Sequence, residues 1–312
     1  MFKIIQYNST YYTIWNAFVE ESKRTTFLFH RDYMEYHKEH FEDFSLMIFD
    51  DKRLVAILPA NRIGQVVYSH QGLTYGGFYF LSKMALNKIE IIFESIFKFL
   101  KEKKIKKLIL KQMPDLYLDD NQGVDSLLFN RYKCSLIKRE MSLMIDYKKT
   151  VSISKSKMKH FNKINKLGLE IREESNFKPF WTQVLEPRLL NRYNTKPVHS
   201  LAEIQKLRNL FPVNIIQYSV YFQNEIMAGI TLFVSKKGIK SQYGATTTLG
   251  EKYRALDFLF IKLIQKYENS FQFFDMGTVS DDSSLGYNVG LLKQKIELGC
   301  LIYNFDIYEI EI

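Results

Sequence analysis

Residues 215–246 read IIQYSVYFQNEIMAGITLFVSKKGIKSQYGAT, and this stretch sets the fold class. Ile215–Phe222 and Ile226–Val234 are rich in β-branched and aromatic residues, and the polar residues 223–225 separate them, which is typical of a β-hairpin. Gly238–Thr246 predicts a third strand. A three-stranded meander is therefore expected in this half of the chain.

The segments on both sides of the meander predict helices and further strands. Before it we expect a strand over Leu167–Ile171 and helices over Phe177–Tyr193 and Ser200–Leu210. After it we expect a helix over Tyr253–Glu268, a strand over Phe271–Met276, a helix over Tyr287–Leu298 and a strand over Leu301–Ile310. The second half thus reads strand, two helices, meander, helix, strand, helix, strand.

The first half repeats this order. Strands are predicted over Phe2–Tyr7, Phe44–Phe49, Arg53–Ala60, Gly64–Ser69, Lys106–Lys111 and Ser142–Tyr147, and helices over Tyr11–Lys23, Arg31–Phe41, Leu86–Lys103 and Gly123–Tyr132. A repeated order predicts two similar domains, 1–147 and 148–312. The expected class is α/β (α+β), each domain having a mixed central sheet flanked by helices.

The segment Lys148–Lys166 joins the two halves and carries seven lysines and no acidic residue. Its start, VSISKSK, reads as a linker, and Ser154 is a suitable N-cap for a helix that follows. The whole chain has 312 residues and a formal net charge of +10, with 33 lysines against 11 arginines. Arginine is the better bidentate phosphate ligand, so the charge reflects either a functional basic surface or compositional bias.

Composition and motifs exclude several classes of protein. Two cysteines, Cys134 and Cys300, rule out a disulfide-stapled scaffold, and no apolar run reaches the length of a membrane span. The start of the chain lacks the features of a signal peptide, so a cytoplasmic location is expected. Walker A, GxGxxG and GxSxG motifs are absent, and His37 and His40 lack metalloprotease spacing, so no metal site is expected.

Five stretches resemble the FemAB-like branch of the GNAT acyltransferase fold. They are YSHQGLTYGGFYF (Tyr68–Phe80), SKSKMKHFNKINKLGLEIRE (Ser154–Glu173), LEPRLLNRYNTKPVHSLAEI (Leu185–Ile204), QYGATTTLGEKYRALDFLFIKLI (Gln242–Ile264) and FFDMGTVSDDSSLGYNVGLLKQKIELGC (Phe273–Cys300). The resemblance implies two tandem GNAT-like domains, with the active site mainly in the second. It also implies N-acyltransfer of an acetyl or aminoacyl group to an amine of a cell-envelope precursor, such as an amino sugar or a peptidoglycan stem peptide.

The resemblance implies two alternative acyl donors, acetyl-CoA (or another acyl-CoA) and aminoacyl-tRNA. GNAT proteins hold the thioester's pyrophosphate on a glycine-rich loop at a helix N-terminus. The matching positions here are Gly250, Lys252, Tyr253, Arg254 and Ala255, and only the first keeps a glycine. The sequence therefore departs from the usual CoA-binding pattern, whereas tRNA would suit the basic surface.

Three residues are candidates for catalysis. Asp275 ends the apolar strand FQFFD and can accept a proton from an amine, although an aspartate there can also cap the following loop. Tyr287 begins a predicted helix and can donate a proton to a leaving group, or simply pack. His199 precedes another helix and can act as a base, or pack against that helix.

Five residues are candidates for binding the substrate. Arg188 and Arg192 lie one helical turn apart and can clamp a phosphate or carboxylate, or form a solvated face. Tyr243 lies near the end of the meander, Lys293 lies on the last predicted helix, and Tyr75 precedes two glycines that permit close approach of a ligand. The competing hypothesis is a non-catalytic scaffold that binds RNA or an anionic surface through Lys148–Lys166.

Overall fold

The computed structural model describes residues 2–81, 84–118 and 124–312, and the chain forms two compact units. Unit 1 comprises Met1–Glu140 and Asn304–Ile312, and unit 2 comprises Met141–Tyr303. Strands β9 (Cys134–Asp146) and β15 (Leu301–Glu311) each run from one unit into the other. The domain boundary expected at residue 147 remains a prediction. The compact units divide instead after Glu140, and unit 1 also includes Asn304–Ile312.

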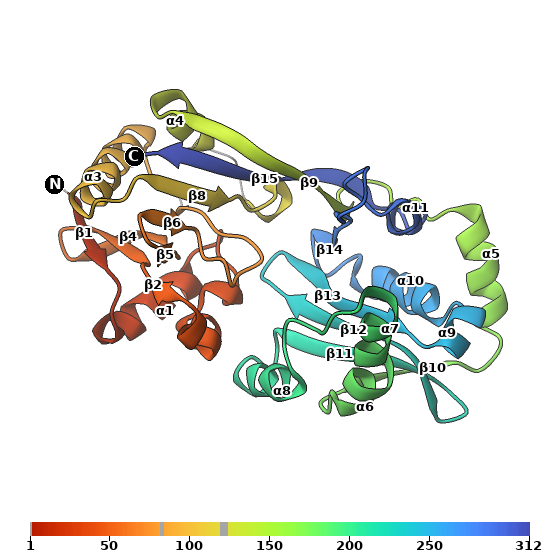
Figure 1. The fold of residues 1–312 in the computed structure, drawn as a ribbon. Helices are drawn as coiled ribbons and strands as arrows, with labels where there is room; N and C mark the ends of the chain where they lie inside the picture. Colours follow the sequence, from red (N-terminus) through yellow and green to blue (C-terminus); the bar gives the residue numbers. More distant parts are fainter. Residues whose placement is uncertain (1, 82–83, 119–123) are drawn as a thin grey trace. The chain divides into compact units, whose positions relative to one another are not determined.

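Unit 1 contains two groups of strands (Figure 1). The first group, in the order β1-β3-β4-β7, comprises β1 (Phe2–Gln6), β3 (Leu46–Asp50), β4 (Arg53–Leu58) and β7 (Tyr79–Phe80), all antiparallel. In the second group, β8 (Lys107–Lys111) pairs antiparallel with β15 and parallel with β6 (Val66–Tyr68), and β5 (Asn61–Ile63) joins β6 to β2 (Glu42–Asp43). The sequence analysis missed the short strands β2, β5 and β7.

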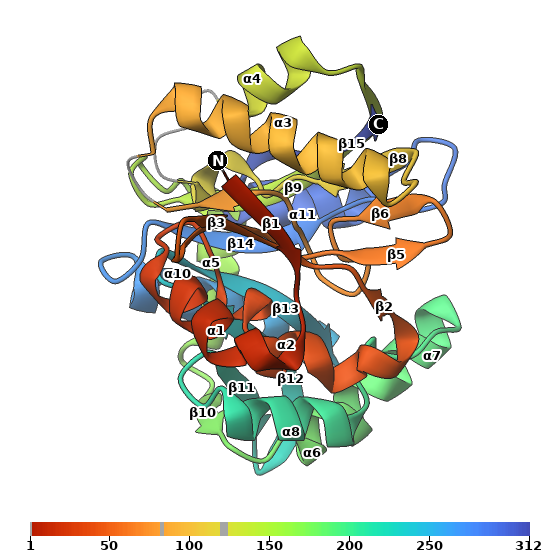
Figure 2. The same cartoon turned by 90° about the vertical axis from the view of Figure 1, so that its left-hand side faces the viewer.

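The helices of unit 1 are α1 (Tyr12–Glu21), α2 (Arg31–Met34), α3 (Leu86–Glu102) and α4 (Val124–Arg131), with 3₁₀ turns over Ser9–Tyr11, Phe27–Phe29, Glu35–His40 and Asp115–Tyr117. The predicted start of the fourth helix, Gly123, lies outside the described residues. Helix α3 lies along the sheet (Figure 2) and buries its apolar stripe, from Ile89 to Leu100, against strands β3 and β4. The helix predicted over Arg31–Phe41 is instead α2 followed by a 3₁₀ turn, because His37 leaves helical geometry at φ −127°.

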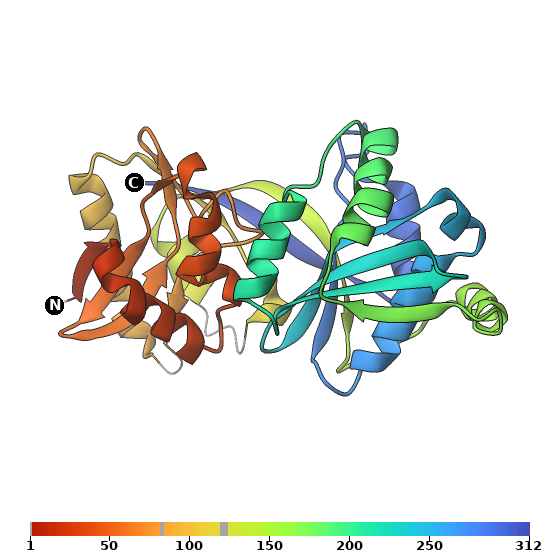
Figure 3. The same ribbon diagram turned by 90° about the horizontal axis from the view of Figure 1, so that it is seen from below.

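Unit 2 has a sheet in the order β10-β11-β12-β13-β14-β9 (Figure 3). The strands are β10 (Glu170–Glu174), β11 (Ile215–Phe222), β12 (Glu225–Val234), β13 (Gly238–Thr246) and β14 (Phe273–Thr278), together with the end of β9. The predicted meander is confirmed as β11, β12 and β13. Neighbouring strands are antiparallel except β13 and β14, which are parallel.

The helices of unit 2 are α5 (Lys155–Ile164), α6 (Lys178–Phe180), α7 (Glu186–Tyr193), α8 (Leu201–Leu210), α9 (Thr248–Lys252), α10 (Ala255–Tyr267) and α11 (Val289–Glu297). A π-helical turn, Trp181–Leu185, joins α6 to α7, so the predicted helix Phe177–Tyr193 contains a bulge. Helix α10 is the most buried, and its Phe258, Leu259 and Leu263 pack in the core against the sheet.

The α/β class, with mixed sheets flanked by helices, is confirmed. Ser154 caps α5 as predicted, since its side chain accepts a hydrogen bond from the Lys157 N–H. Among the helices of the described ranges, none combines the length and the apolar character needed to cross a bilayer.

Candidate functional site

The two parallel strands of unit 2 separate within the sheet. β13 and β14 pair only over Gly238–Lys240 and Phe273–Asp275. Beyond this point β13 continues to Thr246 beside β12, with a register shift, while β14 continues to Thr278. The sheet therefore opens between the carboxyl-terminal ends of two parallel strands, which is where ligands bind in many α/β proteins.

Asp275 lies buried at the point where the strands separate. Its carboxylate accepts hydrogen bonds from Lys240 Nζ at 3.1 Å and from the Gly277 N–H at 2.6 Å. The Ser142 hydroxyl lies 3.5 Å from the same carboxylate. This ion pair joins β13 to β14 at the last paired position, so Asp275 helps to fix the geometry of the opening.

Lys295, on α11, reaches the end of β14. Its Nζ donates hydrogen bonds to the Gly277 carbonyl at 3.1 Å and the Thr278 carbonyl at 2.8 Å. Burial, and then the nearby Lys240, lower the pKa of Lys295 to about 8, while Asp275 acts in the opposite direction. A buried lysine that titrates near neutral pH is typical of a functional site.

The sequence analysis missed Lys295 and named the exposed Lys293 instead. A usable signal is present, because Leu292, Lys295 and Leu298 recur at intervals of three on the core-facing side of α11. A lysine in an apolar stripe is costly unless its amine has partners.

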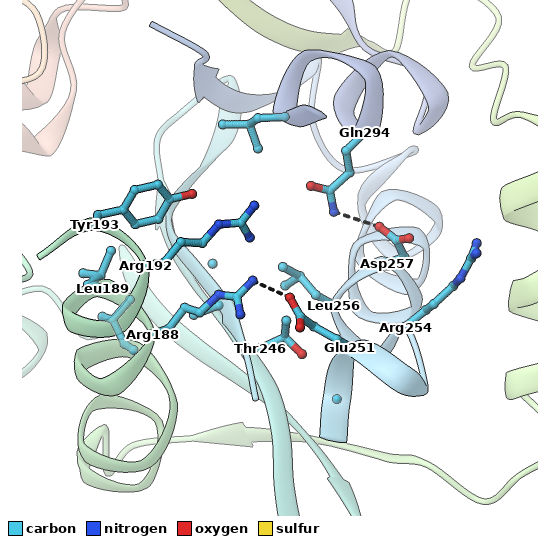
Figure 4. A pocket seen from close by; sticks show the side chains of 15 residues that line it. Arg188, Leu189, Arg192, Tyr193, Thr246, Glu251, Arg254, Leu256, Asp257 and Gln294 are labelled. Atoms are coloured by element: carbon cyan, nitrogen blue, oxygen red, sulfur yellow. Dashed lines mark hydrogen bonds and ion pairs between the residues drawn. The ribbon is translucent and has the colours of Figure 1, made fainter. Parts of the chain in front are cut away.

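A cavity of about 320 Å³ lies beside the end of β13, bounded by α7, α9, α10 and α11. Figure 4 shows Arg188 and Arg192 entering it from α7, Glu251 from α9, Asp257 from α10 and Gln294 from α11. A second cavity, of about 550 Å³, lies next to the first and shares Arg188, Arg192, Thr246 and Glu251 with it.

Three of the charged side chains that line this cavity, Arg188, Glu251 and Asp257, form ion pairs. Arg188 forms an ion pair with Glu251, which joins α7 to α9. Asp257 forms an ion pair with Lys157 of α5 and accepts a hydrogen bond from Gln294 Nε2 at 2.9 Å. These contacts join α7 to α9, and α10 to both α5 and α11. The predicted residues Arg188 and Arg192 do lie together, lining the cavity.

The five predicted cofactor residues lie around the start of α10. Gly250 and Arg254 line the cavity, and Arg254 has a left-handed backbone (φ 50°) that separates α9 from α10. Gly250 is required for packing, since a Cβ there would lie 2.1 Å from the Met227 carbonyl oxygen. Lys252 is exposed, Tyr253 packs against the Phe222 ring and Ala255 is buried in the core.

The start of α10 lacks the glycine-rich loop that would hold a coenzyme A pyrophosphate, since Lys252, Tyr253, Arg254 and Ala255 stand there. The Asp257 side chain belongs to the first turn of α10, where it already complements the positive end of the helix dipole. Glu251 adds a second carboxylate to the same cavity. Both carboxylates are paired with cations, and Arg192 and Arg254 also line the cavity.

The buried His199 and the half-buried Tyr243 form a pair outside this cavity. The Tyr243 hydroxyl lies 2.6 Å from His199 Nδ1 and also accepts a hydrogen bond from the His199 N–H at 3.1 Å. Burial raises the pKa of Tyr243 to about 12. The Trp181 indole N–H donates to the His199 carbonyl at 3.2 Å, so the pair fixes the loop before α8. A separate cavity of about 700 Å³ is lined in part by His199.

The remaining predicted residues lie apart from the cavity. Tyr287 is half-buried before α11, where it forms an isolated β-bridge with Ser280. Tyr75 is buried in unit 1, where its ring lies 5.0 Å from that of Tyr117. The catalytic and substrate-binding roles expected for these residues remain predictions. In the described part of the chain no three His, Cys, Asp or Glu side chains cluster in a way that would hold a metal.

Comparison with known proteins establishes the fold. No family model and no curated protein matches the sequence. Among solved structures, FemX is 10% identical, with 99% of this chain and 97% of that chain covered and a TM-score of 0.72. L-PGS from Bacillus licheniformis is 14% identical, with 86% and 83% covered and a TM-score of 0.59. A tandem GNAT protein from the clavulanic acid biosynthesis pathway is 7% identical, with 100% and 98% covered and a TM-score of 0.50. The chain therefore has the FemAB-like fold of tandem GNAT type that the sequence resemblance predicted.

Proposed function

We propose that this protein is an N-acyltransferase that moves an acyl or aminoacyl group from an activated ester to an amine. The single observation that carries the proposal is the opening between β13 and β14, with Lys295 at the end of β14 and a cavity beside the end of β13. The FemAB-like fold is consistent with this chemistry.

The reaction needs positioning and proton transfer. The amine nitrogen attacks the acyl carbon, a C–N bond forms, and the bond from carbon to the leaving oxygen breaks. The nitrogen loses one proton and the leaving oxygen gains one. The opening of the sheet provides backbone groups of β13 beyond Lys240 that β14 does not pair, and these can donate a hydrogen bond to the developing oxyanion.

In this proposal Lys295 transfers the proton. Its pKa of about 8 lets it exist in both protonation states near neutral pH, so it can accept a proton from the amine and return it to the leaving oxygen. Asp275, predicted as the proton acceptor, already accepts hydrogen bonds from Lys240 and Gly277. We therefore assign Asp275 a positioning role, in which its charge maintains the ion pair beside Lys295.

The donor proposed here is an ester carried on RNA, since the start of α10 lacks the glycine-rich loop of a pyrophosphate site. The acceptor class comes from the FemAB-like resemblance, which implies an amine of a cell-envelope precursor. FemX and L-PGS, both similar in fold, support this direction without naming the acceptor.

The test incubates the protein with bulk tRNA charged with labelled amino acids and with peptidoglycan-precursor peptides and amino sugars as acceptors. Mass spectrometry then detects new amide products. We expect a product with the native chain and none with Lys295→Met.

Lys295→Arg is the matched variant. Arginine retains a positive charge and donors for both carbonyls but does not deprotonate in proteins. A loss of transfer in Lys295→Arg, with the fold intact by circular dichroism, supports proton transfer. Full activity in Lys295→Arg would overturn that role, and no product with any donor would overturn the proposed function.

A further inference from the structure

Helix α5 presents two different faces. Lys157, Phe161 and Ile164 are buried, and the two apolar side chains belong to the core of unit 2. Lys155, Lys159 and Lys163 are exposed, as is Lys166 just after the helix. We call these four exposed lysines the lysine stripe. Figures 1 and 3 both place α5 at the outer side of unit 2, with α10 next to it.

The four lysines of the lysine stripe lie on one side of the helix. At about 100° per residue, they fall within an arc of about 80° and extend over about 16 Å of helix length. The buried residues lie on the opposite side. The segment 148–166 has no acidic residue that would neutralise the stripe. Such a row of cations can neutralise several phosphates of a nucleic acid backbone.

The inward face of α5 connects the helix to the cavity. Lys157 forms an ion pair with Asp257, which lines the cavity, and its amine lies 3.9 Å from Glu297 of α11. Phe161 packs against Phe258 of α10 at a ring-centroid distance of 5.6 Å. A polyanion on the lysine stripe would therefore bind to the outer face of a helix whose inner face holds a wall of the cavity.

The choice between RNA and an anionic membrane follows from the apolar residues of α5. A helix that lies on a membrane inserts its apolar face into the lipid. Here Phe161 and Ile164 are already used in the core of unit 2, and the outer face offers lysine and asparagine. Recognition by this face is therefore electrostatic, which fits an RNA backbone better than a lipid surface.

We infer that the lysine stripe of α5 is a binding surface for the phosphodiester backbone of RNA. The inference goes beyond acyl transfer, because it concerns binding alone and holds or fails whatever reaction the cavity supports. If the proposed function also holds, RNA bound to the lysine stripe would carry the acyl donor. The donor would then be held by its RNA backbone and would need no pyrophosphate-binding loop.

The test compares two variants of equal charge. In the stripe variant Lys155, Lys159, Lys163 and Lys166 become glutamine, and in the control Lys98, Lys101, Lys104 and Lys106 of unit 1, which are also exposed, become glutamine. Binding to a labelled RNA hairpin is measured by fluorescence anisotropy over a range of salt concentrations. The slope of log K against log salt reports the number of phosphates neutralised.

We expect the stripe variant to lose at least tenfold in affinity and about 3 units of salt slope, whereas the control keeps the native slope. Equal losses in both variants would show that only net charge matters and would overturn the inference. Native binding by the stripe variant would overturn it too. Binding to phosphatidylglycerol vesicles that depends on the stripe, without binding to RNA, would reassign the surface to membrane. Acyl transfer is measured separately, so its absence leaves this result interpretable.

Discussion

Lys295 donates its hydrogen bonds to two backbone carbonyls, those of Gly277 and Thr278. Its charge is therefore solvated by dipoles of the chain and not by a paired carboxylate. Asp275 is close enough to influence its pKa but is itself paired with Lys240. This arrangement makes the lysine sensitive to pH, because losing its proton relieves the cost of burying a charge.

The first prediction concerns stability as a function of pH. Lys295 has a folded pKa of about 8 against an ordinary value of 10.5. Between these values the unfolded chain binds a proton that the folded chain does not, so the free energy of unfolding rises with pH. We expect the native chain to gain about 3 kcal/mol relative to Lys295→Met between pH 7 and pH 10.5. Urea unfolding of both proteins at the two pH values measures the difference, and a constant difference would contradict the lowered pKa.

A second prediction uses two glycines of the cavity. A Cβ at position 250 would lie 2.1 Å from the Met227 carbonyl oxygen, whereas at position 244 the nearest atom is 3.6 Å away. We expect Gly250→Ala to destabilise the protein by about 2 kcal/mol and Gly244→Ala to have little effect. Thermal unfolding of both variants measures this contrast. Equal stabilities would mean that α9 can move away from β12 without cost.

At the scale of elements, ion pairs between helices hold the cavity together. Lys157 joins α5 to Asp257 of α10, and Arg188 joins α7 to Glu251 of α9. Neither pair follows from sequence periodicity, because each connects helices that are distant in the sequence. Removing one partner of a mostly buried pair leaves a charge without compensation.

The third prediction is that Lys157→Met destabilises unit 2 by about 3 kcal/mol. The exposed Lys155→Met, on the same helix, should change stability by less than about 0.5 kcal/mol. Denaturant unfolding of the two variants provides the measurement. If they are equally stable, the ion pair with Asp257 contributes nothing to the docking of α5.

Sequence patterns predicted the long, periodic elements well. The hairpin of β11 and β12 was found from its β-branched and aromatic residues and the polar turn between them. The amphipathic α3 was found because its apolar residues recur at a period of 3.6. The short helix α9 was missed, because its five residues are too few to give a periodic signal. The cavity arginines were found from their spacing, but Lys295 depends on contacts with β14 that are local only in the folded chain.

At the scale of the whole molecule, the chain has a net charge of +10, and the segment 148–166 contributes seven of its lysines. The seven lysines of residues 148–166 divide into one buried anchor, Lys157, and exposed residues that include the lysine stripe. The net charge alone does not distinguish the buried lysine from the exposed ones. The structure of α5 therefore decides which lysines are available to a partner.

The fourth prediction concerns the acyl donor. Millimolar acetyl-CoA should not change the midpoint of thermal unfolding, because the start of α10 lacks the glycine-rich loop of a pyrophosphate site. A ligand that binds only the folded state must raise stability, by about 3 kcal/mol at a hundredfold excess over its dissociation constant. A concentration-dependent rise of several degrees would contradict the prediction and restore the thioester as a donor.

Strand β15 has a consequence for the order in which the protein is made. Ile109 of β8 pairs with Glu309 of β15, so unit 1 contains residues that the ribosome adds after all of unit 2. Until then β8 has β6 as a partner but lacks β15, and an incomplete strand edge attracts other chains. Unit 2 is built from contiguous residues, whereas the strand pairing of unit 1 stays incomplete until the residues of β15, which follow unit 2 in the chain, have been synthesised.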